Sequence, residues 1–109
     1  MFLNIKEMDV QELHELMEQG ENNFKLIDVR TPAEVARGAI RGGENIPLHL
    51  IPLKVADFKD EEKVIIYCRT GARSGQACAF LESNGIHNAV NVRGGIVAWA
   101  QMGYPIENL

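Results

Sequence analysis

A continuous apolar run that ends in a cysteine constrains this sequence more than any other feature. Residues 64–67 are Val, Ile, Ile and Tyr, and Cys68 follows them directly. A short segment rich in arginine and glycine comes next, and a helix is predicted from Ser74 to residue 84. A wholly apolar strand of this kind is typical of the middle of a parallel sheet that is covered on both faces. The order strand, loop, helix therefore predicts an α/β fold.

The position of Cys68 predicts a reactive thiol. Open α/β sheets bind their ligands outside the carboxyl ends of the strands, which is where Cys68 would lie. The N-terminal N–H groups of the following helix would face the same loop, and they favour an anion such as a thiolate. Arg69 and Arg73 add positive charge, and Gly71 lets the loop backbone curl into a nest of N–H groups. We therefore expect a lowered pKa and a nucleophilic role for Cys68.

The alternative is that Cys68 is a small buried hydrophobic residue, as most cysteines outside special settings are. The two nearby arginines argue against this interpretation, because burying two cations beside an inert thiol would be costly.

The rest of the chain repeats the alternation of strands and helices. Two helix starts carry capping boxes, in which Asp9 pairs with Glu12 and Thr31 with Glu34. A third helix is expected from Ile96 to residue 102. Strands are expected at residues 2–5, 24–29, 45–46 and 89–92, a turn at residues 42–44, and a loop or irregular helix at residues 48–58. Strands and helices at this spacing predict a three-layer α/β/α single domain over residues 1–109, with a mostly parallel central sheet.

Composition excludes several classes of partner. The formal net charge of −4 argues against a nucleic-acid-binding surface, which would be basic. No apolar run approaches the length of a membrane span. The first residues contain no basic segment followed by an apolar one, so no secretory signal is predicted. Two cysteines in a chain without a signal indicate reduced thiols, and we expect the protein in the cytoplasm.

Five motifs occur in a fixed order: residues 26–30 with Glu34, residues 38–47, residues 68–74, the pair 94–95 with Trp99, and residues 103–105. Together they resemble the rhodanese-like domains, and specifically the single-domain thiosulfate sulfurtransferases, over residues 5–106. The resemblance implies the rhodanese-like fold and no metal or other cofactor.

The resemblance also implies sulfur transfer by double displacement. The Cys68 thiolate would attack the outer sulfur of thiosulfate or another persulfide donor, and would then carry a persulfide. A thiophilic acceptor would remove that sulfur, namely cyanide in an assay and a thiol or a sulfur-carrier protein in the cell. The substrate-binding loop would consist of Arg69, Thr70, Gly71, Ala72, Arg73 and Ser74. We expect Arg69 to contact the anionic donor.

Several residues outside the loop receive weaker assignments. Arg73 either faces the substrate or turns back to Asp28 at the neighbouring strand end, and we favour the pairing with Asp28. Asp28 and Arg30 are accordingly expected to support the loop from behind. Trp99 and Cys78 are expected in the core, and a resolving-thiol role for Cys78 lacks the short Cys-x-x-Cys spacing. Arg93 either adds positive potential to the site or lies on the surface.

Three other functions remain open. Protein tyrosine phosphatases have five residues between their cysteine and arginine, whereas four separate Cys68 from Arg73 here. The shorter loop disfavours phosphate for steric reasons, and an arsenate reductase is a related alternative. A non-catalytic recognition module is the third class. A sulfur relay between protein partners is a variant of the main hypothesis, and it would need the same loop.

Overall fold

The structure, a computed structural model, describes residues 5–20 and 23–108. The elements are β1 (Lys6–Met8), α1 (Val10–Glu18), β2 (Lys25–Asp28), α2 (Pro32–Val35), β3 (Gly43–Asn45), the 3₁₀ helix η1 (Leu48–Phe58), β4 (Val64–Tyr67), α3 (Ala72–Ser83), β5 (Ala89–Val92) and α4 (Gly95–Gln101). Strands and helices alternate along the chain, as the sequence predicts. None of the helices in the described part of the chain has the length and apolar character needed to cross a membrane.

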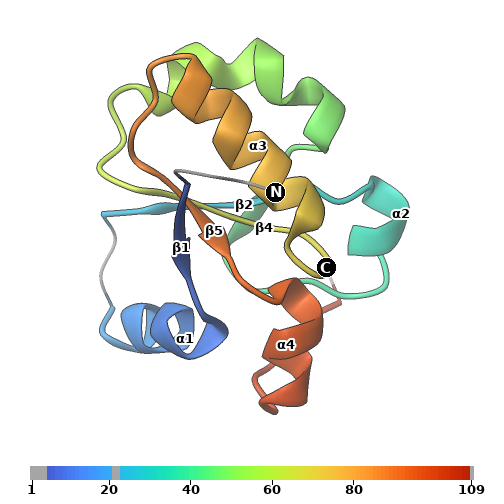
Figure 1. The fold of residues 1–109 in the computed structure, drawn as a ribbon. Helices are drawn as coiled ribbons and strands as arrows, with labels where there is room; N and C mark the ends of the chain where they lie inside the picture. The colour runs from blue at the N-terminus through green and yellow to red at the C-terminus, as the bar shows by residue number, and fades with distance from the viewer. Residues whose placement is uncertain (1–4, 21–22, 109) are drawn as a thin grey trace.

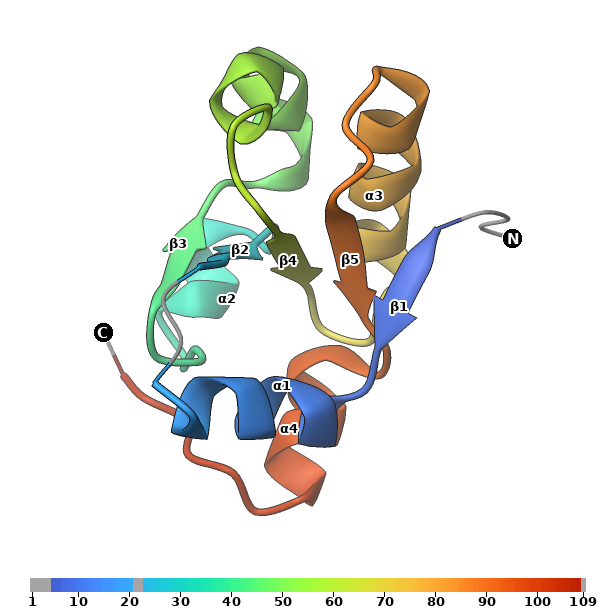
Figure 2. The ribbon, with the colours of Figure 1, turned by 90° about the vertical axis from the view of Figure 1, so that its left-hand side faces the viewer.

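The five strands form one parallel sheet (Figure 1), and their order in it is β1-β5-β4-β2-β3 (Figure 2). Strand β4 lies in the middle of that order and β1 and β3 lie at the edges. Helices α3 and η1 cover one face, and α1 and α4 cover the other (Figure 2). This arrangement confirms the predicted three-layer α/β/α fold.

Strand β4 is buried on both faces because its side chains alternate between two apolar layers. Val64, Ile66 and Cys68 belong to the cluster under α3 and η1. Ile65 and Tyr67 belong to the cluster that contains residues of α1 and α4. A strand with an apolar side chain at every position is required for this central place, which explains the unbroken run in the sequence.

Both predicted capping boxes are present. The Asp9 carboxylate accepts from the N–H of Glu12 at 2.8 Å, and the Thr31 hydroxyl accepts from the N–H of Glu34 at 3.3 Å. In each case the glutamate side chain accepts from the backbone N–H of the capping residue. Because these bonds satisfy the first free N–H groups of each helix, the starts of α1 and α2 were readable from the sequence.

Three sequence predictions about strands and turns are wrong in position. The first strand is β1 at Lys6–Met8 rather than residues 2–5, of which residues 2–4 lie outside the described residues. The predicted turn at residues 42–44 and strand at residues 45–46 are replaced by β3 at Gly43–Asn45. Glycine in a strand gives no pattern of its own, and Gly43 is placed by its pairing with β2.

Candidate functional site

Cys68 lies directly after β4, at the carboxyl end of the central strand, as predicted. The loop that follows turns at Gly71, which has a φ of +108° and lies in the left-handed region that glycine favours. Helix α3 therefore begins at Ala72, two residues before the predicted start at Ser74. As a consequence Ala72, Arg73 and Ser74 all belong to the first turn of the helix.

The Cys68 sulfur is held in a ring of donors. The backbone N–H of Gly71 donates to Sγ at 3.1 Å, and the Ser74 hydroxyl lies 3.3 Å from it. Only 1% of Cys68 is exposed. Burial by itself raises the pKa of the thiol. Hydrogen bonds from the Ser74 hydroxyl and from the N–H groups of Ser74, Gly71 and Thr70 outweigh it, so the pKa lies below its ordinary value. The predicted direction is thus correct, with hydrogen bonds as its main source.

The start of α4 supports the loop from the side. The N–H of Ile96 donates to the Cys68 carbonyl at 3.0 Å, and the N–H of Val97 donates to the Arg69 carbonyl at 3.1 Å. Gly95 allows this approach: a Cβ atom there would lie 2.5 Å from both carbonyl oxygens. The Gly94-Gly95 pair therefore fixes the backbone that carries the thiol, even though the pair is 26 residues away from Cys68 in the sequence.

A groove borders the loop at Arg69. Arg69 and Thr70 are exposed, as is Ala72 on the first turn of α3. The groove has a volume of about 310 Å³, at the lower end of the range typical of ligand pockets. Its lining combines arginines with apolar side chains: Arg30, Glu34, Arg37, Gly38, Arg69, Ile96, Val97, Ala100 and Ile106. Such a lining suits an anionic group that is attached to an apolar one.

Arg73 does not pair with Asp28, so the favoured sequence prediction is wrong. Its guanidinium instead forms a bidentate ion pair with Glu34, with Nη1–Oε1 at 2.7 Å and Nη2–Oε2 at 2.8 Å. This pair ties α2 to the first turn of α3. It also holds the pKa of Glu34 down at about 2, chiefly through the hydrogen bond from Arg73. The sequence indicates a capping box for Glu34 and its place in the first of the five motifs, but it predicts no ion pair with Arg73.

Asp28 is engaged by Arg30 instead. The guanidinium Nη2 lies 2.7 Å from Oδ2 of Asp28, and both side chains are almost fully buried. The backbone N–H of Arg30 donates to the same carboxylate at 3.0 Å. Arg30 also donates to the carbonyl of Gly38 at 2.8 Å. Arg30 therefore occupies both carboxylate oxygens of Asp28 with its backbone N–H and its guanidinium. Arg73 pairs elsewhere because Asp28 already has this cation.

Sequence reasoning missed Asn91, which lies on β5 directly behind the loop. Its Oδ1 lies 2.5 Å from the Ser74 hydroxyl. Its Nδ2 donates to the carbonyl of Gly71 at 3.2 Å and to the carboxylate of Glu7 at 3.0 Å. Only 2% of Asn91 is exposed. The sequence signal that could have identified Asn91 is its polar side chain within the otherwise apolar strand at residues 89–92.

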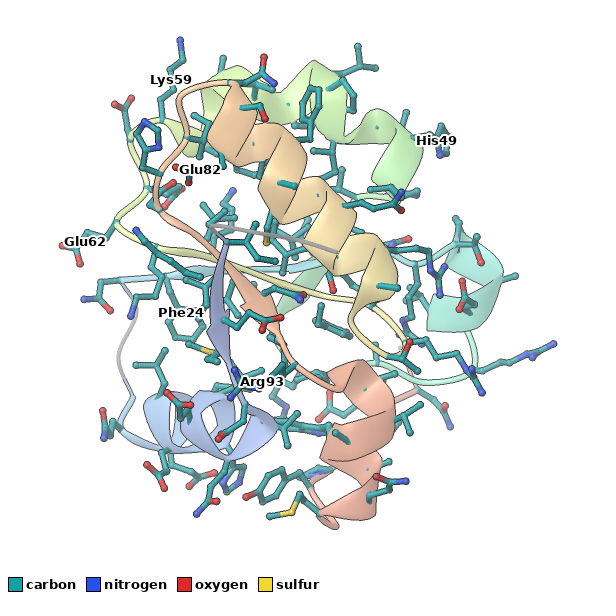
Figure 3. All side chains as sticks on the ribbon, viewed as in Figure 1. Phe24, His49, Lys59, Glu62, Glu82 and Arg93 are labelled. Carbon is teal, nitrogen blue, oxygen red and sulfur yellow. The ribbon has the colours of Figure 1, made fainter. Side chains whose placement is uncertain are left out.

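The remaining candidates lie away from the sulfur or in the core. Trp99 and Cys78 are buried, as predicted, and burial raises the pKa of the Cys78 thiol to about 12. Both cysteines are free. Arg93 is exposed where β5 leads into α4 (Figure 3). Its guanidinium pairs with Glu7 and Asp9. Arg93 thus occupies the surface position that the sequence left as one of two options.

Comparison with known proteins agrees with this fold and loop. The family model described as "Rhodanese-like domain" matches residues 9–102. A protein named sulfurtransferase from Allochromatium vinosum is 44% identical over 102 residues, which cover 94% of each chain. A rhodanese-related protein from Thermoplasma volcanium has a TM-score of 0.83 at 31% identity, over 95% of this chain and 99% of that one. A thiosulfate sulfurtransferase from Pseudomonas aeruginosa has a TM-score of 0.84 at 25% identity, over 95% of this chain and 20% of its own. This chain belongs to the family of rhodanese-like domains.

Proposed function

We propose that this protein is a sulfurtransferase that moves a sulfane sulfur from an anionic donor such as thiosulfate to a thiol acceptor, through a persulfide on Cys68. The observation that carries the proposal is the setting of the Cys68 sulfur. It is buried at the carboxyl end of β4, accepts from the N–H of Gly71, and faces the Ser74 hydroxyl. The relatives named above support sulfur as the transferred atom.

In the first half-reaction the Cys68 thiolate attacks the outer sulfur of the donor. A new S–S bond forms at Cys68 while the S–S bond of thiosulfate breaks, and sulfite departs with the electron pair. The N–H groups of the loop stabilise the negative charge before and after transfer. Arg69, which is exposed on the rim of the groove, is the proposed contact for the donor anion.

In the second half-reaction an acceptor thiolate attacks the outer sulfur of the Cys68 persulfide. The bond between the two sulfurs breaks, and the Cys68 thiolate leaves with its electrons, ready for another cycle. The groove supports an organic or protein-bound acceptor, because Ile96, Val97 and Ile106 give it more apolar surface than an inorganic anion needs. Two free cysteines support the reducing cytoplasm as the compartment.

Phosphoryl transfer is less compatible with the same loop. A phosphatase of this type would use the arginine that follows its cysteine to bind the phosphate oxygens. Here both terminal nitrogens of Arg73 are engaged by Glu34. Together with the short spacing between Cys68 and Arg73, this pairing favours sulfur over phosphate as the substrate atom.

The mass of the intact protein after incubation with excess thiosulfate tests the proposal. We expect an increase of about 32 Da, one sulfur atom, that cyanide or a thiol removes. Cys68→Ser should show no increase, whereas Cys78→Ser should gain the sulfur as the native protein does. An increase that persists in Cys68→Ser would overturn the assignment of the nucleophile.

A protein without any adduct from thiosulfate would refute thiosulfate as donor. The same measurement with a protein persulfide as donor then separates the two remaining functions. Sulfur on Cys68 from that donor alone would identify a relay between proteins. No sulfur from either donor would refute sulfur transfer and leave a recognition module or an oxyanion reductase, for which arsenate is the next reagent.

A further inference from the structure

The Ser74 hydroxyl faces two acceptors and has one hydrogen to donate. Its Oγ lies 3.3 Å from the Cys68 sulfur and 2.5 Å from Oδ1 of Asn91. A serine hydroxyl carries a single O–H, so it can donate to only one of the two at a time. The side chains of all three residues are buried, and water cannot replace the bond that is not made.

The orientation of the Asn91 amide is fixed by its other neighbours. Its Nδ2 group faces the backbone carbonyl of Gly71 and the carboxylate of Glu7, and both of these groups can only accept. Turning the amide around would place Oδ1 against two acceptors. The oxygen of Asn91 must therefore face Ser74, where it can only compete for the hydroxyl hydrogen.

We propose that Asn91 is a positioning residue that competes with the Cys68 thiolate for the hydroxyl hydrogen of Ser74, and thereby limits how strongly the loop favours the thiolate. The inference rests on the proposed role of Cys68 as a nucleophile. While the sulfur is a neutral thiol, the hydroxyl donates to Asn91. When the thiolate forms, the charge-assisted bond to sulfur prevails and Oδ1 of Asn91 loses its partner. That buried, unpaired oxygen disfavours the thiolate.

The competition acts on a sulfur that is the nucleophile in the first half-reaction and the leaving group in the second. After the first half-reaction the negative charge lies on the outer sulfur of the persulfide, so the hydroxyl returns to Asn91. When the acceptor attacks, charge reappears on the Cys68 sulfur, and the hydroxyl turns to it again. A thiolate that is stabilised less strongly is also a better nucleophile, because nucleophilicity falls as the pKa falls.

The charged and titratable groups around this hydroxyl come from several elements. Glu7 on β1 contacts Asn91, and Arg73 on α3 interacts with Cys68 through charge. Cys78, also on α3, interacts through charge with both Glu7 and Cys68. It stays neutral because burial raises its pKa to about 12. Arg69 is exposed at the start of the loop. None of these groups accepts a hydrogen bond from the Ser74 hydroxyl, so the competition stays between the sulfur and Asn91.

A double-mutant cycle on the pKa of Cys68 tests the proposal. The pKa is measured in the native protein, Asn91→Ala, Ser74→Ala and the double variant, from the rate of alkylation by iodoacetamide between about pH 5 and pH 10. Asn91→Ala also removes the bond to the Gly71 carbonyl, but any loosening of the loop appears with and without Ser74 and cancels in the cycle. No sulfur donor is present, so the result is independent of whether thiosulfate is the substrate.

We expect Asn91→Ala to raise the acid dissociation constant of Cys68 about three- to tenfold more with Ser74 present than in the Ser74→Ala background. An equal effect in both backgrounds, or the opposite sign, would overturn the proposal. Asn88→Ala is the matched control. Asn88 precedes the same strand and donates to the backbone carbonyls of Phe58 and Glu61, so its removal should give no coupling to Ser74. If Asn91→Ala does not fold, Asn91→Val, which suits a strand, takes its place in the cycle.

Discussion

The ion pair between Arg73 and Glu34 should make a measurable, pH-dependent contribution to stability. Glu34→Gln is the suitable change, because glutamine keeps the capping box with Thr31 while it removes the charge that Arg73 needs. In the native protein both carboxylate oxygens of Glu34 accept from the guanidinium, at 2.7 and 2.8 Å. The pair connects α2 to the first turn of α3, which follows the loop after Cys68.

The size of the effect follows from the pKa of Glu34, which falls from its ordinary 4.5 to about 2, with the hydrogen bond from Arg73 as its largest cause. At about 1.4 kcal/mol per pKa unit, a fall from 4.5 to about 2 corresponds to roughly 3 to 4 kcal/mol before solvent screening. The side chains are 33% and 28% exposed, so solvent screens the pair, and bonds from Thr31 supply part of the shift. We therefore expect a loss of about 1–2 kcal/mol for Glu34→Gln at neutral pH.

The pH dependence has a definite sign. Since the folded pKa lies below the unfolded one, the stabilisation is complete above about pH 4.5 and is lost as the pH falls toward 2. Urea unfolding of the native protein and of Glu34→Gln, at pH 7 and at several pH values below 4.5, measures this contribution to the unfolding free energy. The difference in unfolding free energy should narrow as the pH falls. A difference that does not change with pH, or one near zero at pH 7, would refute the ion pair as a source of stability.

Two further substitutions test the loop and its groove. Gly95→Ala should cost at least about 2 kcal/mol of unfolding free energy and most of the sulfur transfer, because its Cβ would collide with the carbonyls of Cys68 and Arg69. Gly103→Ala, with a φ of +80° and nothing within 4 Å of its Cβ, is the control, and an equal loss there would refute the steric argument. Arg69→Ala should raise KM for thiosulfate and change stability by less than about 0.5 kcal/mol. Arg41→Ala removes the same charge from an exposed site outside the groove, and an equal rise in KM there would show that the effect is only one of net charge.

The sequence was sufficient wherever neighbouring residues decide the structure. The apolar run at residues 64–67 needs cover on both faces, as in the middle of a parallel sheet, and it predicted β4 and the place of Cys68. The capping boxes satisfy helix N–H groups within a single turn, so they marked the starts of α1 and α2. For η1 the sequence predicted the bounds but not the type of structure, a loop or an irregular helix. Pro52 within it has no N–H for a regular helical hydrogen bond, so no regular pattern marks the segment.

Prediction failed where a charged side chain has several possible partners, some near in the sequence and some distant. Asp28 accepts from Arg30, whose backbone N–H and side chain reach the carboxylate together. Arg73 is then left to Glu34, 39 residues away. A local motif shows which side chains are charged. Which cation pairs with which carboxylate depends on how the helices and strands pack against one another. The choice between Arg30 and Arg73 could not be read without the geometry of α2.

The same reasoning explains why the thiol chemistry is only partly local. The loop after Cys68 supplies the N–H groups by itself, and these alone would stabilise a thiolate. The hydroxyl of Ser74 adds a donor whose availability is set by Asn91 on β5, and Asn91 is oriented in turn by Glu7 on β1. The first step leads from helix α3 to β5, and the second from β5 to its parallel neighbour β1. A copy of the loop on another scaffold would therefore keep the N–H groups around the sulfur but lose the control that Asn91 exerts on its charge, so the proposed site extends to β5 and β1.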